Sequence, residues 1–328
     1  MIRFAVIGTS FITEWFLNAA KECKELQFAA VCSRDGQKGK ELAQRHNSEA
    51  RVYTKLEELA QASDIDAVYI ASPNSLHCEQ AILMMNGKKH VLCEKPFASN
   101  AEETERMLEV ARKNKVILLE GMRSAFDPGF QKIKENLGEL GTIRNVTFQF
   151  CQYSSRYDEL KAGKRANVFS WDYSGGVLMD LGIYCIHPMV ELFGEPKKVL
   201  ANTVMVEGVD GAGSIIAEYE GMQVNLSYSK ISAGGSFGQI QGESGYMTIS
   251  DIAAPNEVII HYNDGTEEIL EYRPAGMNLI YEIKQWAELI QKHSMPEESQ
   301  MITRQVMKVV DQVKKQVGIQ FPADKEGM

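Results

Sequence analysis

The chain has 328 residues and a formal net charge of −9, with 44% of its residues hydrophobic and 24% charged. This length suits two ordinary domains, and the composition is typical of a soluble globular protein. The acidic balance makes a poor general binder of nucleic-acid backbones, although it leaves room for a local basic pocket, and no apolar run is long enough to predict a membrane span. No signal-peptide pattern precedes the first apolar run, and the six cysteines form no C-x-x-C pair, so we expect a cytoplasmic protein with reduced thiols and no metal site.

Short apolar runs alternate with helical periods over the first 120 residues. We expect helices between residues 12 and 23, over 74–86 and over 100–114, the last capped by Ser99 or Asn100. The runs themselves are continuously apolar, as in strands that are covered on both faces. They predict a doubly wound parallel sheet whose strands are "RFAVI" (3–7), "FAAVCS" (28–33), "AVYIAS" (67–72), "HVLCE" (90–94) and "VILLE" (116–120).

The segment "IGTSFIT", residues 7–13, joins the first strand to the first helix. A strand, a tight glycine turn and a helix N-terminus can hold a dinucleotide pyrophosphate, because the helix N–H groups and dipole favour negative charge. Gly8 permits the turn, Ser10 is small and adds a hydroxyl, and Thr13 replaces a third glycine. The alternative interpretation is an ordinary strand-to-helix turn without a ligand.

The segment "CSRDGQKGK" at the end of the second strand bears on the choice of cofactor. A carboxylate at this place would bind the ribose of NAD, whereas Ser33, Arg34 and Lys38 offer a hydroxyl and two cations to the 2′-phosphate of NADP. Asp35 keeps NAD as the alternative, because a shift of one residue in the loop would offer its carboxylate instead. We therefore expect NADP rather than NAD as the cofactor. The alternative interpretation is that this segment is a solvated surface turn that binds neither cofactor.

Two later segments follow parallel strands, at the sheet edge where open α/β folds bind ligands. "SPNSLH" (72–77) begins a helix, and "CEKPF" (93–97) ends a strand. Pro96 restricts the backbone of Lys95 to extended geometry and so fixes the direction of the chain there. A lysine without such neighbours would be a solvated surface charge.

Alternating strands replace this pattern after Gly121, where we place the boundary between a first domain, 1–121, and a second, 122–328. "TIRNVTFQFCQY" (142–153) predicts a long strand, and three later segments each predict two strands around a turn, the last turn being Asp264-Gly265. The second domain is thus a large, mostly antiparallel sheet covered by helices on one face.

The expected covering helices lie near 124–137 and 178–193. Two apolar stripes near the end of the chain, 279–290 and 302–317, predict two more helices, the second ending at Gly318. That final helix is the segment that could pack back on the first domain.

Four segments together resemble the glucose–fructose oxidoreductase, inositol dehydrogenase and rhizopine-catabolism family, often written Gfo/Idh/MocA. They are "GTSFIT", "SPNSLH", "EKPF" and "SGGVLMDLGIYCIHPMVELFGEP" (174–196), and the similarity runs through to the final "VGIQFP". Ser10 at the second glycine position resembles the anhydrofructose reductase and dihydrodiol dehydrogenase branch. The loop is therefore interpreted as a working variant of the dinucleotide-binding turn.

The resemblance implies an NADP(H)-dependent oxidoreductase that transfers a hydride between nicotinamide and a secondary alcohol or ketone of a sugar, polyol or related cyclic diol. It implies that Lys95 reaches both the cofactor ribose and the substrate, and that Asp180 and Tyr184 carry the second catalytic position. Asp180 is then a catalyst, a substrate anchor or a group that orients Lys95. His187 stands where many relatives have Asp or Asn, which leaves its contact with substrate open.

The chemistry agrees with this assignment. Oxidation of an alcohol needs a base for the hydroxyl proton, and a phenol serves as one only when a cation such as the Lys95 ammonium stabilises the phenolate. Tyr184 could instead be a half-buried aromatic residue whose hydroxyl only makes a hydrogen bond. A non-catalytic NAD(P)-binding sensor or scaffold of the same fold is the alternative function, and a nucleotide-sugar or glycoside-processing relative is a third.

The candidate residues fall into three groups. Those expected to be catalytic are Lys95, Tyr184 and Asp180, and those expected to contact substrate are Lys95, Asp180, Tyr184 and His187. Those expected to bind the cofactor are Gly8, Ser10, Phe11, Ile12, Ser33, Arg34, Lys38, Ser72, Asn74, His77, Glu94, Lys95, Arg123 and Trp171. The expected partners are a small-molecule substrate and further copies of the chain, in a homodimer or homotetramer formed through the second sheet, with neither nucleic acid nor membrane.

Overall fold

The computed structural model describes residues 1–325, and the chain divides into two compact units. The first unit comprises Met1–Met122 and Leu279–Thr303, and the second comprises Arg123–Asn278 and the residues from Arg304 onward. The grouping of 279–303 with the first unit corrects the expectation that every residue after 121 belongs to the second domain.

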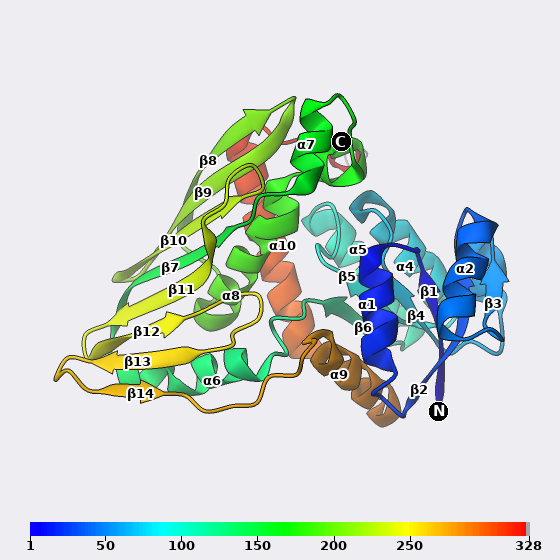
Figure 1. Ribbon diagram of the computed structural model, residues 1–328, viewed down its shortest axis with the longest axis horizontal. Coiled ribbons are helices and arrows are strands. Elements are labelled where there is room, and N and C mark those ends of the chain that lie inside the picture. Colours follow the sequence, from blue (N-terminus) through cyan, green and yellow to red (C-terminus); the bar gives the residue numbers. More distant parts are fainter. Residues whose placement is uncertain (326–328) are drawn as a thin grey trace. The chain divides into compact units, whose positions relative to one another are not determined.

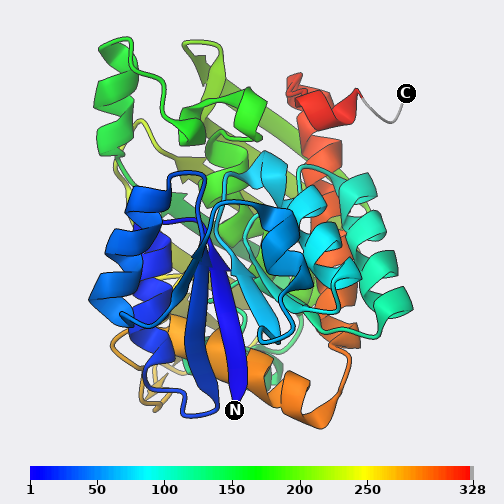
Figure 2. The ribbon, with the colours of Figure 1, turned by 90° about the vertical axis from the view of Figure 1, so that its right-hand side faces the viewer.

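The first unit contains a six-stranded parallel sheet in the order β3-β2-β1-β4-β5-β6. This is the doubly wound order of a dinucleotide-binding fold, as predicted. Figure 2 shows its blue and cyan strands between helices on either side. Only β3 was not predicted, because it has three residues and begins with an exposed arginine. The strands are β1 (Ile2–Ile7), β2 (Leu26–Cys32), β3 (Arg51–Tyr53), β4 (Ala67–Ile70), β5 (His90–Glu94) and β6 (Leu118–Gly121).

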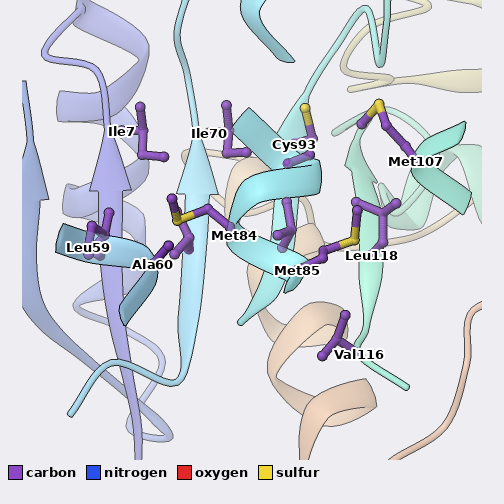
Figure 3. Packing of buried hydrophobic residues seen from close by; sticks show 14 of the residues in the cluster. Ile7, Leu59, Ala60, Ile70, Met84, Met85, Cys93, Met107, Val116 and Leu118 are labelled. Atoms are coloured by element: carbon purple, nitrogen blue, oxygen red, sulfur yellow. The ribbon is translucent and has the colours of Figure 1, made fainter. Parts of the chain in front are cut away.

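Helices cover both faces of this sheet. On one face, Leu59, Met84 and Met107 of α3, α4 and α5 pack against strand residues such as Ile70 and Leu118 (Figure 3). The helices of the unit are α1 (Phe11–Ala20), α2 (Gly36–His46), α3 (Leu56–Gln61), α4 (His77–Asn86), α5 (Ala101–Asn114) and α9 (Leu279–Lys292). The α5 helix is capped by Asn100, whose side chain accepts a hydrogen bond from the Glu103 N–H at 2.8 Å. Of the two predicted caps, Ser99 and Asn100, the second is therefore the one in the structure.

The α9 helix belongs to the first unit because its apolar stripe packs beside α1. Ile283 and Trp286 of that stripe are fully buried. Phe16 of α1 stacks on Tyr69 of β4 with ring centroids 3.7 Å apart, which completes the core on this face of the sheet. Burial of this apolar surface, rather than position in the sequence, decides the grouping.

The second unit contains an eight-stranded sheet in the order β14-β13-β12-β11-β7-β10-β9-β8. All neighbours are antiparallel except β7 and β10 (Figure 1). The predicted hairpin at Asp264-Gly265 joins β13 to β14. The strands are β7 (Ile143–Cys151), β8 (Lys198–Val206), β9 (Val209–Tyr219), β10 (Met222–Ser229), β11 (Gly235–Gly242), β12 (Gly245–Ile249), β13 (Val258–Tyr262) and β14 (Glu267–Ile269).

Helices cover one face of this sheet, and α8 lies directly against β7 and β10. Val224, Leu226 and Tyr228 of β10 are buried on the covered face. The helices are α6 (Pro128–Asn136), α7 (Ser155–Lys161), α8 (Ile183–Phe193) and α10 (Glu297–Val317), and a π-helical turn, Leu178–Gly182, precedes α8. One stretch, 171–193, has the length and composition of a membrane span, but 78% of its apolar window is buried in the protein, as in a core helix.

The final helix, α10, divides between the two units. Its first part groups with the first unit, where the Gln300 side chain donates to the Leu118 carbonyl and Thr303 donates to Glu120, and from Arg304 onward it groups with the second unit. In the second part, the Gln316 side-chain amide accepts from the Ala201 N–H at 3.1 Å and donates to the Val199 carbonyl at 2.8 Å. These two bonds satisfy main-chain groups of the edge strand β8 that no neighbouring strand pairs.

Candidate active site

The first loop of the first unit has the geometry of a pyrophosphate cradle. Gly8 has a φ of +107°, and a Cβ atom at this position would lie 2.5 Å from the Ala71 carbonyl oxygen, so only glycine fits. Ser10 is exposed and immediately precedes α1, and its hydroxyl caps none of the helix N–H groups within residues 1–325. The first turn of α1 therefore keeps its N–H groups and its positive dipole end for an anion.

The loop after β2 separates the cations from the carboxylate that complicated the choice of cofactor. Asp35 caps α2, because its Oδ1 accepts hydrogen bonds from the N–H groups of Gln37 at 3.0 Å and Lys38 at 3.3 Å. Arg34 and Lys38 are exposed, and their side chains make no ion pair or hydrogen bond with any described residue. The donor set of this loop thus fits a 2′-phosphate, since Asp35 is engaged with the helix.

The segment 72–77 is built around His77. His77 is fully buried, and its two ring nitrogens lie 3.0 Å from the main-chain carbonyls of Pro96 and Ser72. Burial lowers the pKa of His77. The ring therefore supports the turn that carries Lys95, and a main-chain carbonyl lies beside each of its nitrogens.

Lys95 is half-buried and lies after β5, on the turn that His77 supports; its peptide bond to Pro96 is cis. Two acidic side chains lie at or near the ends of the neighbouring strands β5 and β6. Glu94 ends β5 and accepts a short hydrogen bond from the Tyr69 hydroxyl, and Glu120 lies one residue before the end of β6. Ser72 donates through its hydroxyl to Gln80 at 2.7 Å, so this side chain is already engaged with α4.

In the second unit, Tyr184 lies at the start of α8 and is held by Arg123. The Arg123 Nε donates to the Tyr184 hydroxyl at 3.2 Å, and its guanidinium carbon lies 5.4 Å from the centre of the Tyr184 ring. Arg123 is itself fixed by Asn278, whose Oδ1 accepts from Nη1 at 2.8 Å. Asn278 in turn donates to Asp127 Oδ2 at 3.1 Å. A continuous polar chain thus positions the phenol.

Asp180 lies in the π-helical turn before α8 and forms an ion pair with Lys230, which follows β10. The Lys230 side chain is 9% exposed and that of Asp180 is 26% exposed, so the pair is largely withdrawn from water. The Lys230 ammonium also lies 5.7 Å from the centre of the Phe169 ring. Sequence reasoning missed Lys230, because nothing in "LSYSKIS" links it to a residue 50 positions earlier.

Trp171 occupies a loop that a buried carboxylate holds in place. Its indole N–H donates to Asp210 Oδ1 at 3.2 Å, and the Leu178 N–H donates to Asp210 Oδ2 at 2.8 Å. A Cβ atom at Gly176 would lie 1.9 Å from Asp210 Oδ1, which explains a glycine here. Burial raises the pKa of Asp210. Asp210 was not predicted, although the glycine pair of "SGG" was the available signal for a close approach.

His187 points toward a different group of side chains from Tyr184. It is buried, and its Nδ1 lies 3.5 Å from Glu191 Oε2, while Glu191 Oε1 accepts from Lys134 at 2.9 Å. Burial and the charge of Lys134 lower the pKa of His187 to about 3. The ring is thus a neutral part of the α6–α8 contact, which argues against the expected contact with substrate.

Comparisons with known proteins identify both parts of the chain. Residues 2–122 match the oxidoreductase family with an NAD-binding Rossmann fold, and residues 130–248 match the GFO/IDH/MocA C-terminal domain. The scyllo-inositol 2-dehydrogenase (NADP(+)) of Bacillus subtilis is 44% identical over 327 residues, which are 99% of each chain. The trans-1,2-dihydrobenzene-1,2-diol dehydrogenase of Mus musculus is 28% identical and also covers 99% of both chains.

A solved structure shares the fold. The 3-ketoreductase of Actinomadura kijaniata, in complex with NADP and TDP-benzene, superposes with a TM-score of 0.85 at 23% identity and covers 96% of this chain and 98% of that one. The fold, the two matched domains and the similarity over the full length agree with the resemblance in the sequence motifs. The chain belongs to the Gfo/Idh/MocA family of oxidoreductases.

Proposed function

We propose that this protein is an NADP-dependent dehydrogenase or reductase acting on a secondary alcohol or ketone of a cyclic polyol. The observation that carries the proposal is the Arg123–Tyr184 hydrogen bond, which holds a phenol in place beside a cation. A phenol held in this way is a proton-transfer group, and hydride chemistry at an alcohol carbon requires one. The relative that acts on scyllo-inositol supports the substrate class.

The cofactor proposal rests on the loop after β2. Arg34 and Lys38 are available to a 2′-phosphate, whereas the carboxylate of Asp35 is bonded to the N-terminus of α2. Gly8 and the uncapped start of α1 would receive the pyrophosphate. When bound, the nicotinamide ring accepts or donates the hydride.

The remaining steps belong to the side chains. Tyr184 takes the hydroxyl proton of the alcohol during oxidation and returns it during reduction, and Arg123 stabilises the charge that develops on its oxygen. From the family resemblance, we further propose that Lys95 brings a cation to the substrate. The Asp180 carboxylate, oriented by Lys230, accepts hydrogen bonds from neighbouring hydroxyl groups of the ring. Adjacent hydroxyls on a cyclic polyol suit such an acceptor.

The open face of the second sheet supports a homodimer or homotetramer as the finer part of this proposal. Its exposed residues include Leu200, Val204 and Ile216, each about half exposed, on the adjacent strands β8 and β9. An apolar face of this kind is suited to pairing with the same face of a second copy. Light scattering should then show at least a dimer at micromolar concentration, and Ile216→Glu should lower the measured mass. A wild-type monomer would reject this part.

The six unpaired, buried thiols fit a reducing, cytoplasmic compartment.

The experiment that tests the function is a substrate panel. Purified protein is incubated with scyllo-inositol, other inositols, acyclic polyols and aldose sugars, each with NADP⁺ and with NAD⁺, and reduced nicotinamide is followed by absorbance. We expect turnover of cyclic polyols with NADP⁺, and its loss in Tyr184→Phe. Tight NADP binding without turnover of any alcohol or ketone would favour a sensor and reject the enzyme.

A further inference from the structure

Three acidic side chains of the first unit are buried. Two lie at or near the carboxyl ends of β5 and β6, and the third lies on α9. Glu94, Glu120 and Glu282 are 8%, 5% and 1% exposed. Buried carboxyl groups are costly, so their presence in a fold indicates a task beyond packing. Glu94 is the last residue of β5 and Glu120 is the next-to-last residue of the adjacent strand β6, and the strand register pairs Cys93 with Glu120 and Glu94 with Gly121.

The Tyr69 hydroxyl is a hydrogen-bond partner of Glu94 that favours the ionised, accepting form of its carboxyl group. The Tyr69 hydroxyl donates to its Oε1, and burial together with the nearby Glu94 charge raises the pKa of Tyr69 well above its ordinary value. Tyr69 therefore holds its proton and donates it, which favours the ionised form of Glu94. Glu282, which is buried on α9, is also close enough to Tyr69 to contribute to its raised pKa.

Glu120 lies in a different environment. Its Oε2 accepts a hydrogen bond from the Thr303 hydroxyl at 2.7 Å, while its Oε1 is buried without a hydrogen-bond partner among residues 1–325. Burial, with a further contribution from the charge of Glu94, raises the pKa of Glu120 to about 7. Glu120 thus changes its charge at neutral pH, whereas the contact from Tyr69 favours the ionised form of Glu94.

Among the described residues, Glu94, Lys95 and the Cys93 thiol lie close enough to Glu120 for their charges to interact with it. Burial raises the pKa of Cys93 well above its ordinary value, so the thiol stays neutral. Thr303, on α10, is the hydroxyl donor to the carboxyl. The only cation in this set is therefore the ammonium of Lys95.

We propose that Glu120 is a positioning residue that holds a proton beside Lys95 and thereby leaves the ammonium charge directed at the substrate. This rests on the role of Lys95 in the proposed function. While Glu120 is neutral, the negative charge of Glu94 balances the positive charge of Lys95. When Glu120 loses its proton to solvent, its carboxylate adds a second negative charge to that of Glu94. The two carboxylates together attract the Lys95 ammonium toward the strand ends and away from the reacting oxygen.

The pH profile of turnover distinguishes this role from a structural one. Wild-type kcat should fall on the order of tenfold on the alkaline side of neutrality, because a nearby carboxylate charge typically shifts a pKa by about one unit, which corresponds to a factor of about ten. Glu120→Gln keeps the shape and the neutral form, so this fall should disappear while kcat below neutrality stays close to wild type. A fall that persists in Glu120→Gln would overturn the proposal.

Thr303 provides a matched pair of controls. Its hydroxyl donates to the carboxylate and so favours the ionised form. Thr303→Val removes this donor, which should move the midpoint of the fall to higher pH, whereas Thr303→Ser keeps the donor and should leave the midpoint in place. A midpoint that is equal in all three proteins contradicts the assignment to Glu120.

A readout independent of activity separates this inference from the proposed function. Reductive ¹³C-methylation of the lysines gives each a resonance, and Lys95→Arg identifies that of Lys95. This resonance should shift with pH at the Glu120 midpoint in wild type and should lose that step in Glu120→Gln. A protein that turns over no polyol but shows this step would reject the proposed function alone. A Lys95 resonance without the step would reject the inference, whatever the activity.

Discussion

The Nε of Arg123 donates a hydrogen bond to the Tyr184 hydroxyl at 3.2 Å, and both residues belong to the same compact unit. Sequence reasoning placed Arg123 at the cofactor and Tyr184 at the substrate, without linking them. Because the guanidinium also bonds to Asn278, its orientation is fixed before any ligand arrives. The phenol thus lies beside a preorganised cation, as a group that must carry negative charge during proton transfer requires.

Arg123→Gln should lower kcat by about 10- to 100-fold, the effect of one lost hydrogen bond to a charged group. Arg123→Lys keeps the charge but loses the planar fork, so we expect an intermediate value. Steady-state kinetics at saturating NADP⁺ measures both variants. If kcat is unchanged and only the affinity for NADP falls, the role expected from the sequence holds and Arg123 serves the cofactor.

Local patterns predicted the elements well because their determinants are local. Asn100 caps α5, and Asp264-Gly265 forms the hairpin, each through contacts within a few residues. The partners of the candidate site residues are distant in sequence. Lys230 is 50 residues from Asp180, and Asn278 is 155 residues from Arg123. No periodicity or turn signal encodes such pairs, so sequence could name Asp180 and Tyr184 only through a family resemblance.

The roles of the predicted residues were harder to assign than their positions. His77 lies at the predicted edge of the first sheet, yet both of its ring nitrogens face main-chain carbonyls. The Asp35 carboxylate was the feature that kept NAD as an alternative to NADP. In the structure, this carboxylate caps the N-terminus of α2. In both cases the side chain could serve either a ligand or the backbone. Only the positions of nearby carbonyl and N–H groups decide between those uses.

The second prediction concerns the preference for NADP. Arg34→Ala should weaken NADP binding by about 1.5–3 kcal/mol, a charge-assisted hydrogen bond's contribution, and should leave NAD binding nearly unchanged. Asp35→Ala is the matched control: it removes a helix cap and should cost about 1 kcal/mol of stability without altering the preference. Titration of both cofactors measures the effect. Equal losses for NADP and NAD, or a wild-type preference for NAD, would contradict the assignment.

The third prediction concerns the ion pair between Asp180 and Lys230. Lys230→Met leaves a largely buried carboxylate without this cation and should lower the free energy of unfolding by about 2–3 kcal/mol. Adding Asp180→Asn removes the unbalanced charge, so the double variant should recover part of the loss. Urea denaturation measures all three proteins. Losses that simply add would show that the two side chains act independently.

The fourth prediction concerns pH and His187. Burial and Lys134 lower its pKa to about 3, below the ordinary 6.5 of the unfolded chain, so the unfolded state binds the proton first. Stability is therefore full above pH 6.5 and falls as the pH drops toward 3. His187→Gln should make the melting temperature less steeply dependent on pH across that window and leave KM unchanged. A large rise in KM instead would restore His187 as a substrate contact.

The last prediction concerns Tyr184 and Lys95, the catalytic couple that the family resemblance implies. Tyr184→Phe keeps the ring, which packs 5.5 Å from the ring of Phe150, and removes only the hydroxyl. It should lower kcat by roughly 10²- to 10⁴-fold with NADP affinity nearly unchanged. Lys95→Met should lower kcat at least as much and also weaken cofactor binding, because the family resemblance places this lysine at the ribose.

The double variant tests whether the two groups form a unit. If neither is effective alone, the combined protein should be only slightly slower than the worse single variant, whereas independent groups would multiply their losses. Stopped-flow measurement of the hydride step separates these outcomes from changes in product release. Suppose that Tyr184→Phe is nearly as fast as wild type while Asp180→Asn is inactive. The proton would then pass through Asp180, and the Arg123 hydrogen bond would serve only to hold the helix that carries it.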